Sequence, residues 1–431
     1  MRLLIIGAGP GGYETAVEAA KRGMEVTLIS EGPLGGTCLN EGCIPTKTFC
    51  HYAELIEQNL KAGLDCKPSF ASAAERKQAV IEQLRGGINM LLKGVQVVQG
   101  RAQFKDAGTV VCNGTEYTAD NIIIATGSVS ASLPIPGADS CITSKEILEL
   151  NRVPESLCVI GGGVIGLEFA SIFRSFGSEV TVLEYCPNIL PRFDVDLAKR
   201  LKQSLSKRGI NIEVQAQVTR IDSNTVTYLK KDKEFTVQAD KILMAVGRRP
   251  NTEGLNLEAA GIDYTRKGIT VNDRFETSVP GIYAVGDVTG GIMLAHAATY
   301  QGLHALNCIC GQTDSIRFDL IPAAVFTMPE VATIGLTEEQ CKEQELEVRC
   351  LKSFYRANGK AVSMDETDGY CKIIVASDGK ILGAHLMGAH ASDIIHEIAA
   401  VMNFGSNLDM LQSVIHAHPT LSEVLQSALH A

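Results

Sequence analysis

Two cysteines lie five residues apart in the segment GGTCLNEGCIPTK, which covers residues 35–47. Cys38 and Cys43 could form a disulfide that closes a short loop. We expect them at the start of a helix, where the helix dipole stabilises negative charge and favours the thiolate. Two cysteines with a packing role would not require the Gly-Gly-Thr before them or the Pro-Thr-Lys around and after them. The segment therefore indicates a reactive cysteine pair.

The other cysteines do not have this spacing. The chain contains 13 cysteines, and most occur singly within apolar stretches, as Cys112, Cys158 and Cys371 do. Such cysteines usually behave as small buried hydrophobic residues in a reducing compartment. Cys308 and Cys310 lie close together in an apolar helical run, and we interpret them as packing residues. This cysteine usage is typical of a cytoplasmic protein.

A strand, a glycine-rich turn, a helix and a second strand follow one another twice in the chain. The glycines are Gly7, Gly9 and Gly12 in the first copy, and Gly161, Gly163 and Gly166 in the second. In a G-x-G-x-x-G motif the first glycine permits the tight turn, the second lets the backbone approach a pyrophosphate, and the third allows close packing of helix and strand. Each copy lies between an apolar strand and a helix, which is the context that this motif requires. The two copies predict two dinucleotide sites, one domain length apart.

An acidic residue about 20 positions after such a motif binds the ribose hydroxyls. In the second copy Glu184 ends the strand at this distance, and its carboxylate would accept a hydrogen bond from the 2′-hydroxyl and repel a 2′-phosphate. The second site should therefore prefer NAD to NADP. In the first copy the equivalent position is Ser30, followed by Glu31. Either Glu31 turns inwards or Ser30 makes a weaker contact.

The segment around Cys38 and Cys43 resembles the redox-active disulfide motif of the pyridine nucleotide–disulfide oxidoreductases, and this resemblance covers nearly the whole chain. It implies FAD in the first site and NAD in the second. It also implies that Cys38 exchanges with the substrate while Cys43 faces the flavin. Lys47, one helical turn after Cys43, would approach the flavin and pair with Glu168. The other residues that the resemblance assigns to the cofactors are Gly36, Thr37, Ala102 (adenine), Thr126, Gly127, Gly247, Asp287 (ribitol), Met293, Leu294, Ala295 and His296.

A histidine near the end of the chain could supply a base. A thiol with a pKa of about 8.5 needs one at neutral pH, and a carboxylate on the other ring nitrogen would fix the tautomer of the histidine. The family pattern makes His418 the base and Glu423 its partner. We interpret the remaining candidates as structural histidines: His385, His390, His396 and His416.

Within the family the chain most resembles the dihydrolipoamide dehydrogenases. Glutathione-type reductases use NADP and place basic residues where Glu184 and Tyr185 stand, mercuric reductases usually end in an extra cysteine pair, and soluble transhydrogenases lack the paired cysteines. The resemblance implies oxidation of protein-bound dihydrolipoamide and reduction of NAD. It also implies a homodimer whose C-terminal region completes the partner's site, and a lipoyl-bearing protein of a 2-oxoacid dehydrogenase or glycine cleavage system as partner. The alternatives are an NADH-dependent reductase of another small disulfide or a quinone, and a structural subunit of an acyltransferase core.

The repeated strand, glycine turn and helix predict an α/β fold with two Rossmann-like domains, followed by a C-terminal α+β domain. The resemblance makes the first two FAD/NAD(P)-binding domains and the third a dimerisation domain. We predict an FAD-binding domain from residues 1–145 and 247–316, an NAD-binding domain at 146–246 and an interface domain at 317–431. The strands 122–127, 242–247 and 282–287 each end in a glycine turn.

The composition limits the partners. A chain of 431 residues with a formal net charge of -10 lacks the basic surface that nucleic acids and anionic membranes require. The apolar run at residues 3–6 is too short for a signal peptide, and no stretch is apolar enough for a membrane span. We therefore expect a soluble protein, without a metal site.

Overall fold

The computed structural model describes residues 1–64, 68–405 and 407–430. The chain divides into two compact units. The first unit contains residues 1–48, 72–131 and 247–316, and the second contains residues 49–71, 132–246 and 317–431.

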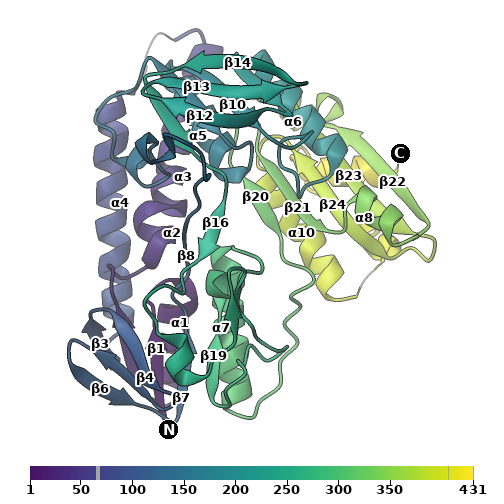
Figure 1. Cartoon of the computed structure of the whole chain (residues 1–431). Coiled ribbons are helices and arrows are strands. Elements are labelled where there is room, and N and C mark those ends of the chain that lie inside the picture. Colours follow the sequence, from purple (N-terminus) through teal and green to yellow (C-terminus); the bar gives the residue numbers. More distant parts are fainter. Residues whose placement is uncertain (65–67, 406, 431) are drawn as a thin grey trace. The chain divides into compact units, whose positions relative to one another are not determined.

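A five-stranded parallel sheet forms the centre of the first unit (Figure 1). Its strands, in spatial order, are β19 (Ile282–Ala284), β7 (Asn121–Ile124), β1 (Arg2–Ile6), β2 (Glu25–Ser30) and β3 (Gln96–Gln99). The β1 and β7 strands are continuous apolar runs because helices or further strands cover both of their faces. Helices α1 (Pro10–Lys21) and α7 (Ala295–Ile309) pack against each other on this sheet.

Shorter elements complete the first unit. Strands β4 (Ala102–Asp106), β5 (Thr109–Cys112) and β6 (Thr115–Thr118) form an antiparallel sheet, β8 (Ser128–Ser130) pairs with β16 (Arg248–Pro250), and β17 (Tyr264–Thr265) pairs with β18 (Gly268–Ile269). Helix α2 (Gly36–Glu41) follows β2, and two longer helices, α3 (Cys43–Lys61) and α4 (Phe70–Leu91), begin or end in this unit.

The second unit repeats the dinucleotide-binding pattern. Its parallel sheet has the order β11 (Ile210–Val214), β10 (Glu179–Glu184), β9 (Ser156–Ile160) and β15 (Lys241–Met244). Helix α5 (Val164–Phe176) ends at Gly177, which has the left-handed conformation typical of a helix C-terminus. Helix α6 (Val195–Lys207) connects β10 to β11, and β12 (Gln217–Asp222), β13 (Thr225–Lys230) and β14 (Lys233–Gln238) form a separate antiparallel sheet.

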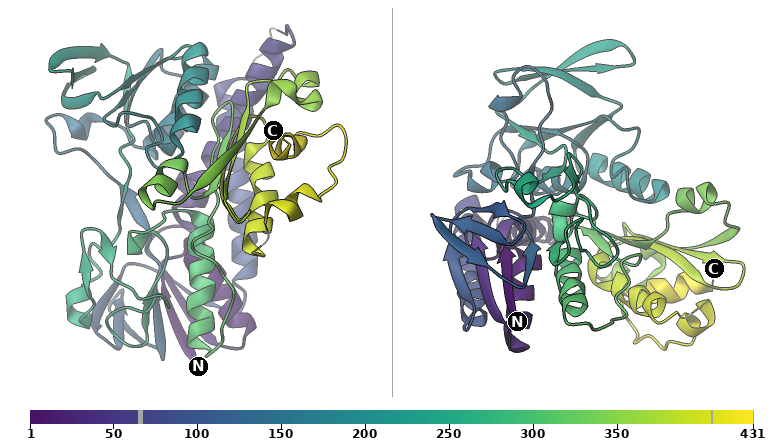
Figure 2. Two further views of the ribbon diagram at one scale, coloured as in Figure 1. Left: turned by 90° about the vertical axis from the view of Figure 1, so that its right-hand side faces the viewer. Right: turned by 60° about the horizontal axis from the view of Figure 1, so that its bottom comes forward.

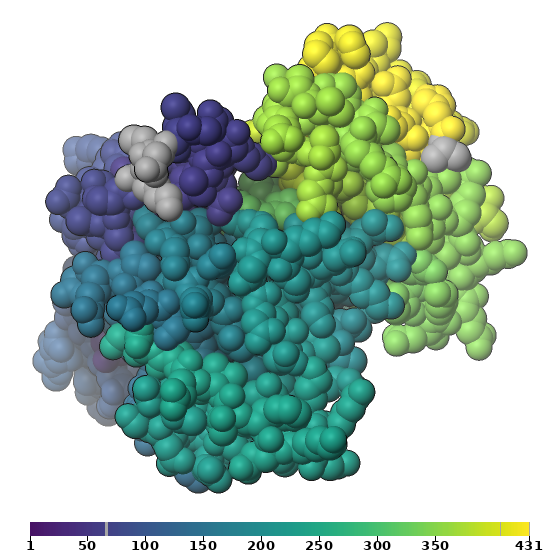
Figure 3. Space-filling view, turned by 90° about the horizontal axis from the view of Figure 1, so that it is seen from above, coloured from purple at the N-terminus to yellow at the C-terminus, as the bar shows by residue number. Residues whose placement is uncertain are grey.

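The C-terminal part of the second unit is an antiparallel sheet covered by helices. The strand order is β20 (Ala323–Val325), β21 (Val331–Gly335), β24 (Ile381–Met387), β23 (Tyr370–Ala376) and β22 (Val348–Phe354). Helices α10 (Ala391–Asn403), α11 (Leu408–Gln412) and α12 (Glu423–Leu429), yellow in Figure 2, bury their apolar faces with this sheet in one core. The short helices α8 (Glu338–Glu343) and α9 (Gly359–Ser363) lie between strands. In Figure 3 the segments after residue 317, green to yellow, form one continuous mass. This sheet and its helices confirm the predicted α+β character of the C-terminal region.

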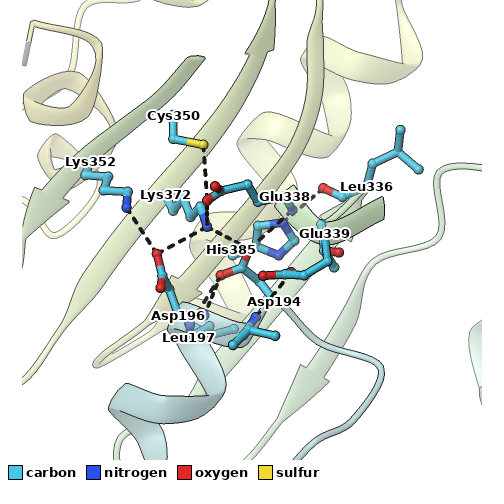
Figure 4. Close-up of polar contacts among 12 residues, drawn as sticks. Asp194, Asp196, Leu197, Leu336, Glu338, Glu339, Cys350, Lys352, Lys372 and His385 are labelled. Atoms are coloured by element: carbon cyan, nitrogen blue, oxygen red, sulfur yellow. Dashed lines mark hydrogen bonds and ion pairs between the residues drawn. The ribbon is translucent and has the colours of Figure 1, made fainter. Parts of the chain in front are cut away.

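A buried ion-pair cluster connects α6 to the C-terminal sheet (Figure 4). The Lys372 ammonium on β23 is fully buried and lies 2.8 Å from Asp194 Oδ2, 2.7 Å from Glu338 Oε2 and 3.4 Å from Asp196 Oδ2. Asp194 is also fully buried and caps α6, because its other carboxylate oxygen accepts hydrogen bonds from two backbone N–H groups of the first turn. Nothing in the sequence pattern predicted this cluster.

In the described ranges, no helix combines the length and the apolar character needed to span a bilayer.

Candidate active site

The first glycine motif leaves an open space in front of the N-terminus of α1. A Cβ atom on Gly12 would lie 1.8 Å from the carbonyl oxygen of Gly7, so the helix can approach the strand this closely only with glycine. A Cβ on Gly9 would meet no atom of the described residues, and no side chain caps the helix there. The N-terminus of α1 therefore faces an opening that fits a pyrophosphate.

The second motif has the same geometry at the start of α5. A Cβ on Gly166 would lie 2.1 Å from the Gly161 carbonyl oxygen, and a Cβ on Gly163 would again meet no described atom. Glu184 ends β10 beside this turn and is buried. Its two carboxylate oxygens accept hydrogen bonds from the backbone N–H groups of Gly162 and Cys186, each at 2.6 Å. These contacts hold the carboxylate at the turn, as its predicted role in binding a ribose requires.

The equivalent position of the first unit differs. Ser30 is buried, and its hydroxyl donates a hydrogen bond to the carbonyl oxygen of Gly32 at 2.8 Å. Glu31 is exposed, and its backbone carbonyl accepts a hydrogen bond from Gln99 at 2.6 Å. The choice between Ser30 and Glu31 as a ribose ligand stays a prediction with two alternatives.

The cysteine pair spans two helices rather than one. Cys38 lies on α2, the chain bends at Gly42, and Cys43 is the first residue of α3. We expected both cysteines at the start of a single helix, but the non-helical backbone of Gly42 (φ -146°, ψ -112°) breaks it. The break gives Cys43 its own helix N-terminus, where negative charge is stabilised. Lys47 follows one turn later on α3, on the same side of the helix as Cys43.

The two cysteines are half-buried thiols in contact with each other. The pKa of Cys38 lies far above its usual value, first because its side chain hydrogen-bonds to Cys43, then because of burial and the neighbouring charge of Cys43. The positive charge of Lys47 lowers the pKa of Cys38 and so opposes part of this increase. Cys43 is the first residue of α3, and a thiolate there is stabilised by the helix N-terminus.

The cysteine segment packs directly on the first glycine motif. The backbone N–H of Gly35 donates to the carbonyl oxygen of Ala8 at 2.9 Å. Gly36 has a φ of +58°, and a Cβ there would lie 2.6 Å from the Cα of Gly9. A larger residue at position 36 would therefore push the reactive segment away from the dinucleotide loop. Thr37, the next residue, is exposed.

Asp287 forms a hydrogen-bonded cluster with Ser128 and Arg248, of which only Asp287 was predicted from the sequence. Its carboxylate accepts a short hydrogen bond from the hydroxyl of Ser128, and the same hydroxyl accepts one from Arg248 Nε at 2.7 Å. Burial lowers the pKa of Arg248, while the nearby charges of Asp287, Cys43 and Glu41 act against this decrease. Arg248 therefore brings a guanidinium close to both Asp287 and the cysteine pair. Its position directly after Gly247, at the end of a predicted strand, was the only available signal.

The remaining residues that the resemblance assigns to FAD also lie in the first unit. Thr126 Oγ1 donates to the carbonyl oxygen of Asn251 at 2.7 Å, and the N–H of Asn251 donates to the carbonyl oxygen of Gly127 at 2.9 Å. Asn251 is thus a second contact that the sequence did not reveal. Ala102 is buried at the start of β4. Around the start of α7, Met293, Leu294 and Ala295 are half-buried and His296 is exposed.

His418 and Glu423 form the predicted pair in the second unit. His418 Nδ1 lies 2.9 Å from Glu423 Oε1, and Glu423 Oε2 accepts the backbone N–H of Thr420 at 2.8 Å. These hydrogen bonds lower the pKa of Glu423, the one from Thr420 most. The His418 side chain is 78% exposed. Because Nδ1 points to the carboxylate, Nε2 is the nitrogen that is left to accept a proton from a substrate thiol.

Two other histidines of the second unit, His385 and His416, have buried polar contacts. His385 is fully buried between the hydroxyl of Thr333 at 2.6 Å and the carbonyl oxygen of Leu336 at 3.1 Å, and burial lowers its pKa. His416 is nearly buried and its Nε2 lies 2.8 Å from Glu397. Glu168 on α5 is buried and accepts the backbone N–H of Phe326 at 3.0 Å. Its pairing with Lys47, which belongs to the first unit, stays a prediction.

Comparisons with known proteins agree with this arrangement. Residues 1–302 match the family model of the pyridine nucleotide-disulphide oxidoreductases, and residues 321–429 match the dimerisation domain of that family. The chain is 41% identical to a dihydrolipoyl dehydrogenase of Geobacillus stearothermophilus, over 99% of this chain and 94% of that protein. It is 39% identical to a dihydrolipoyl dehydrogenase of Bacillus subtilis, over 100% of this chain and 98% of the relative.

Solved structures give the same result. The HOCl-induced flavoprotein disulfide reductase RclA from Escherichia coli superposes with a TM-score of 0.90 at 33% identity, over 100% of this chain and 99% of that one. LpdA from Mycobacterium tuberculosis superposes with a TM-score of 0.91 at 29% identity, again over 100% and 99%. The predicted fold class is confirmed, and the chain belongs to the pyridine nucleotide-disulphide oxidoreductase family.

Proposed function

We propose that the chain is a dihydrolipoamide dehydrogenase, which oxidises protein-bound dihydrolipoamide and reduces NAD⁺ to NADH. The observation that carries this proposal is the contact between Cys38 and Cys43 beside an open dinucleotide loop, in a chain that matches dihydrolipoyl dehydrogenases over nearly its full length. The two motifs and the Asp287 group support FAD as the first cofactor, and Glu184 supports NAD as the second.

The chain's own groups provide the thiol chemistry. His418 Nε2 takes the proton of a dihydrolipoamide thiol, and Glu423 on Nδ1 stabilises the imidazolium that forms. The substrate thiolate attacks Cys38 of the Cys38–Cys43 disulfide and releases Cys43 as a thiolate at the N-terminus of α3. The second thiol of the substrate, as its thiolate, then attacks the substrate sulfur of this mixed disulfide, which closes the lipoamide disulfide and releases Cys38 as a thiol. Lys47 and Arg248 are the cations that stabilise this thiolate. FAD, when bound at the first glycine motif, would supply the acceptor for the electron pair, and NAD⁺ at the second motif would supply the final hydride acceptor.

The proposed function also indicates an oligomeric state, a partner protein and a cellular compartment. The match to a dimerisation domain supports a homodimer in which His418 of one subunit serves the cysteine pair of its partner. Residues 1–145 and 247–316 would form the FAD-binding domain, 146–246 the NAD-binding domain and 317–431 the interface domain. A lipoyl-bearing protein of a 2-oxoacid dehydrogenase or glycine cleavage system is the substrate carrier. Scattered single cysteines support the cytoplasm as the compartment.

A second candidate is an NADH-dependent reductase of another small disulfide or a quinone. The similarity to the flavoprotein disulfide reductase RclA favours it. The test is NADH oxidation by the purified protein with lipoamide, glutathione disulfide or a quinone as acceptor. We expect lipoamide to give the highest kcat/KM, by at least about tenfold. A higher value with either other acceptor would overturn the proposal in favour of the second candidate.

Glu184→Arg is expected to reverse the cofactor preference. The change removes the acceptor for the 2′-hydroxyl and adds a cation for a 2′-phosphate, so the ratio of kcat/KM for NADH over NADPH should fall on the order of a hundredfold. Lipoamide reduction with each nucleotide measures this ratio. Glu184→Gln is the matched control, because it removes the charge but keeps an acceptor, and it should change the ratio less. An unaltered ratio in Glu184→Arg would mean that this side chain does not reach the ribose.

A further inference from the structure

Cys308 contacts His304, and His304 contacts Asp314, at the C-terminal end of α7 and away from the residues assigned to the reaction. His304 and Cys308 are four residues apart on this helix and therefore share one face. Cys308 Sγ lies 3.7 Å from His304 Nε2. His304 Nδ1 lies 2.9 and 3.0 Å from the two carboxylate oxygens of Asp314, in the loop after the helix. This is the order of groups in a thiol–imidazole–carboxylate triad.

The imidazole is held in place on several sides. Asp314 accepts further hydrogen bonds from Asn307 Nδ2 at 2.8 Å and from the backbone N–H of Ile316 at 3.1 Å. Burial opposes ionisation of Asp314, but the hydrogen bonds from Asn307 and His304 hold its pKa below the usual range. The ring of Phe275 meets the His304 ring edge to face at 5.9 Å. The carboxylate thus fixes the ring so that Nε2 points to the sulfur.

Charged groups of neighbouring elements also reach Cys308. The Arg274 guanidinium donates to the Cys308 carbonyl oxygen at 3.3 Å, and a hydrogen bond to the Cys308 side chain is the largest cause of the raised pKa of Arg274. Burial is the largest cause of the raised pKa of Tyr283 on β19; the charges of Glu276 and Cys308 add to this increase, and Arg274 acts against it. The end of α7 stabilises an imidazolium and disfavours a thiolate, whereas Arg274 favours the thiolate.

Neither a packing role for Cys308 nor a metal site explains this arrangement. Packing explains why Cys308 lies at the edge of the core, but it does not require an oriented imidazole at the sulfur. The cluster does not have the geometry of a metal site, because Asp314 and Cys308 face opposite ring nitrogens of His304 and their ligand atoms do not converge; no group that could hold a metal ion occurs among the described residues. Cys308 is half-buried, and the side chains of His304 and Asp314 are 21% and 14% exposed, so the cluster lies at the protein surface.

We propose that Cys308 is a nucleophilic thiol that exchanges with low-molecular-weight disulfides, with His304 as its base and Asp314 as the group that positions His304. His304 Nε2 accepts the proton of Cys308, and the thiolate attacks one sulfur of the disulfide. A bond forms between Cys308 Sγ and that sulfur, the sulfur–sulfur bond of the reactant breaks, and the leaving thiolate takes the proton back from His304. The product is a mixed disulfide on the protein and one molecule of free thiol. No external oxidant other than the disulfide is needed.

The test measures the mixed disulfide on this helix in the oxidised holoenzyme, with glutathione disulfide as the probe and without NADH. Cys310 lies two residues later, beside Arg22 rather than a histidine, and is the matched control thiol. In a Cys310→Ser variant the proteolytic peptide that contains positions 308 and 310 carries only Cys308, and in a Cys308→Ser variant it carries only Cys310. Mass spectrometry of this peptide therefore measures the modification of each cysteine separately. At pH 7 we expect Cys308 to react at least about tenfold faster than Cys310.

The pH dependence separates a base from a structural histidine. In the Cys310→Ser background, His304→Gln should slow modification of Cys308 about tenfold at pH 7 but less than about twofold at pH 10, where a thiol ionises without help. Asp314→Asn should give the same pH-selective loss to a smaller extent. Unchanged bound flavin and melting temperature verify the fold of each variant. Equal rates for Cys308 and Cys310, or an equal loss at both pH values in His304→Gln, would overturn the proposal.

Discussion

Homodimers that carry only Cys38→Ser or only His418→Ala are expected to lose lipoamide reduction by at least about a hundredfold, the usual contribution of a positioned acid–base group or more. Co-refolding the two variants should then restore activity. The C-terminal pair His418–Glu423 completes the partner's cysteine site in the proposed dimer. In a mixed dimer, one site therefore carries both lesions and the other carries none.

The recovered activity has a predicted size. Random pairing makes half of the dimers mixed, and each mixed dimer has one intact site of two, so about a quarter of the wild-type activity should return. Two differently tagged chains allow the mixed dimers to be purified and their lipoamide activity measured. A double variant with both lesions, refolded with wild type, is the control for refolding yield. Purified mixed dimers without recovered activity would show that the base and the disulfide belong to one chain.

Lys372→Met is expected to cause the largest loss of stability in the chain. The substitution keeps much of the side-chain volume but leaves the fully buried carboxylate of Asp194 without its cation, which costs about 3–5 kcal/mol. Denaturant unfolding followed by a probe in the second unit measures this loss. Lys352→Met is the matched control, because Lys352 is 39% exposed, binds the same cluster through Asp196 at 3.1 Å and should contribute at most about 1 kcal/mol. Equal losses in the two variants would contradict the buried-pair argument.

The same cluster should make the second unit sensitive to acid. Hydrogen bonds from Lys342 and Lys372 lower the pKa of Glu338 from 4.5 to about 2. A carboxyl with a lowered folded-state pKa contributes stability above its unfolded pKa and loses it as the pH falls. The difference in stability between wild type and Lys372→Met should therefore shrink between pH 4.5 and 2, because part of it comes from Glu338.

Local spacing was enough to predict the dinucleotide turns and the strands beside them. The reason is that a G-x-G-x-x-G motif places a steric requirement on a few consecutive residues, as the contact between Gly7 and Gly12 illustrates. The His418–Glu423 pair was also accessible, since the two residues are only five positions apart. The break at Gly42 could not be predicted, because a glycine between two cysteines is equally compatible with a continuous helix.

Contacts between distant segments could not be predicted in this way. Asp194 and Lys372 are 178 positions apart, and no periodic pattern connects them. Arg248 reaches Asp287 and the cysteine pair only because β16 pairs with β8. Cys308 was interpreted as a packing residue because its apolar neighbours are visible in the sequence, whereas the orientation of His304 by Asp314 depends on the loop after α7.

Anaerobic titration of the flavoprotein with NADH, followed by absorption spectroscopy, tests the central claim that electrons pass between the cysteine pair and FAD. Cys43 lies at a helix N-terminus, which stabilises its thiolate, so this thiolate should give a long-wavelength charge-transfer band with the flavin after two electrons. Cys43→Ser should abolish the band, and Cys38→Ser should show it without any reductant. A band that survives in Cys43→Ser and disappears in Cys38→Ser would reverse the two roles. The absence of a band in all three proteins would contradict the account.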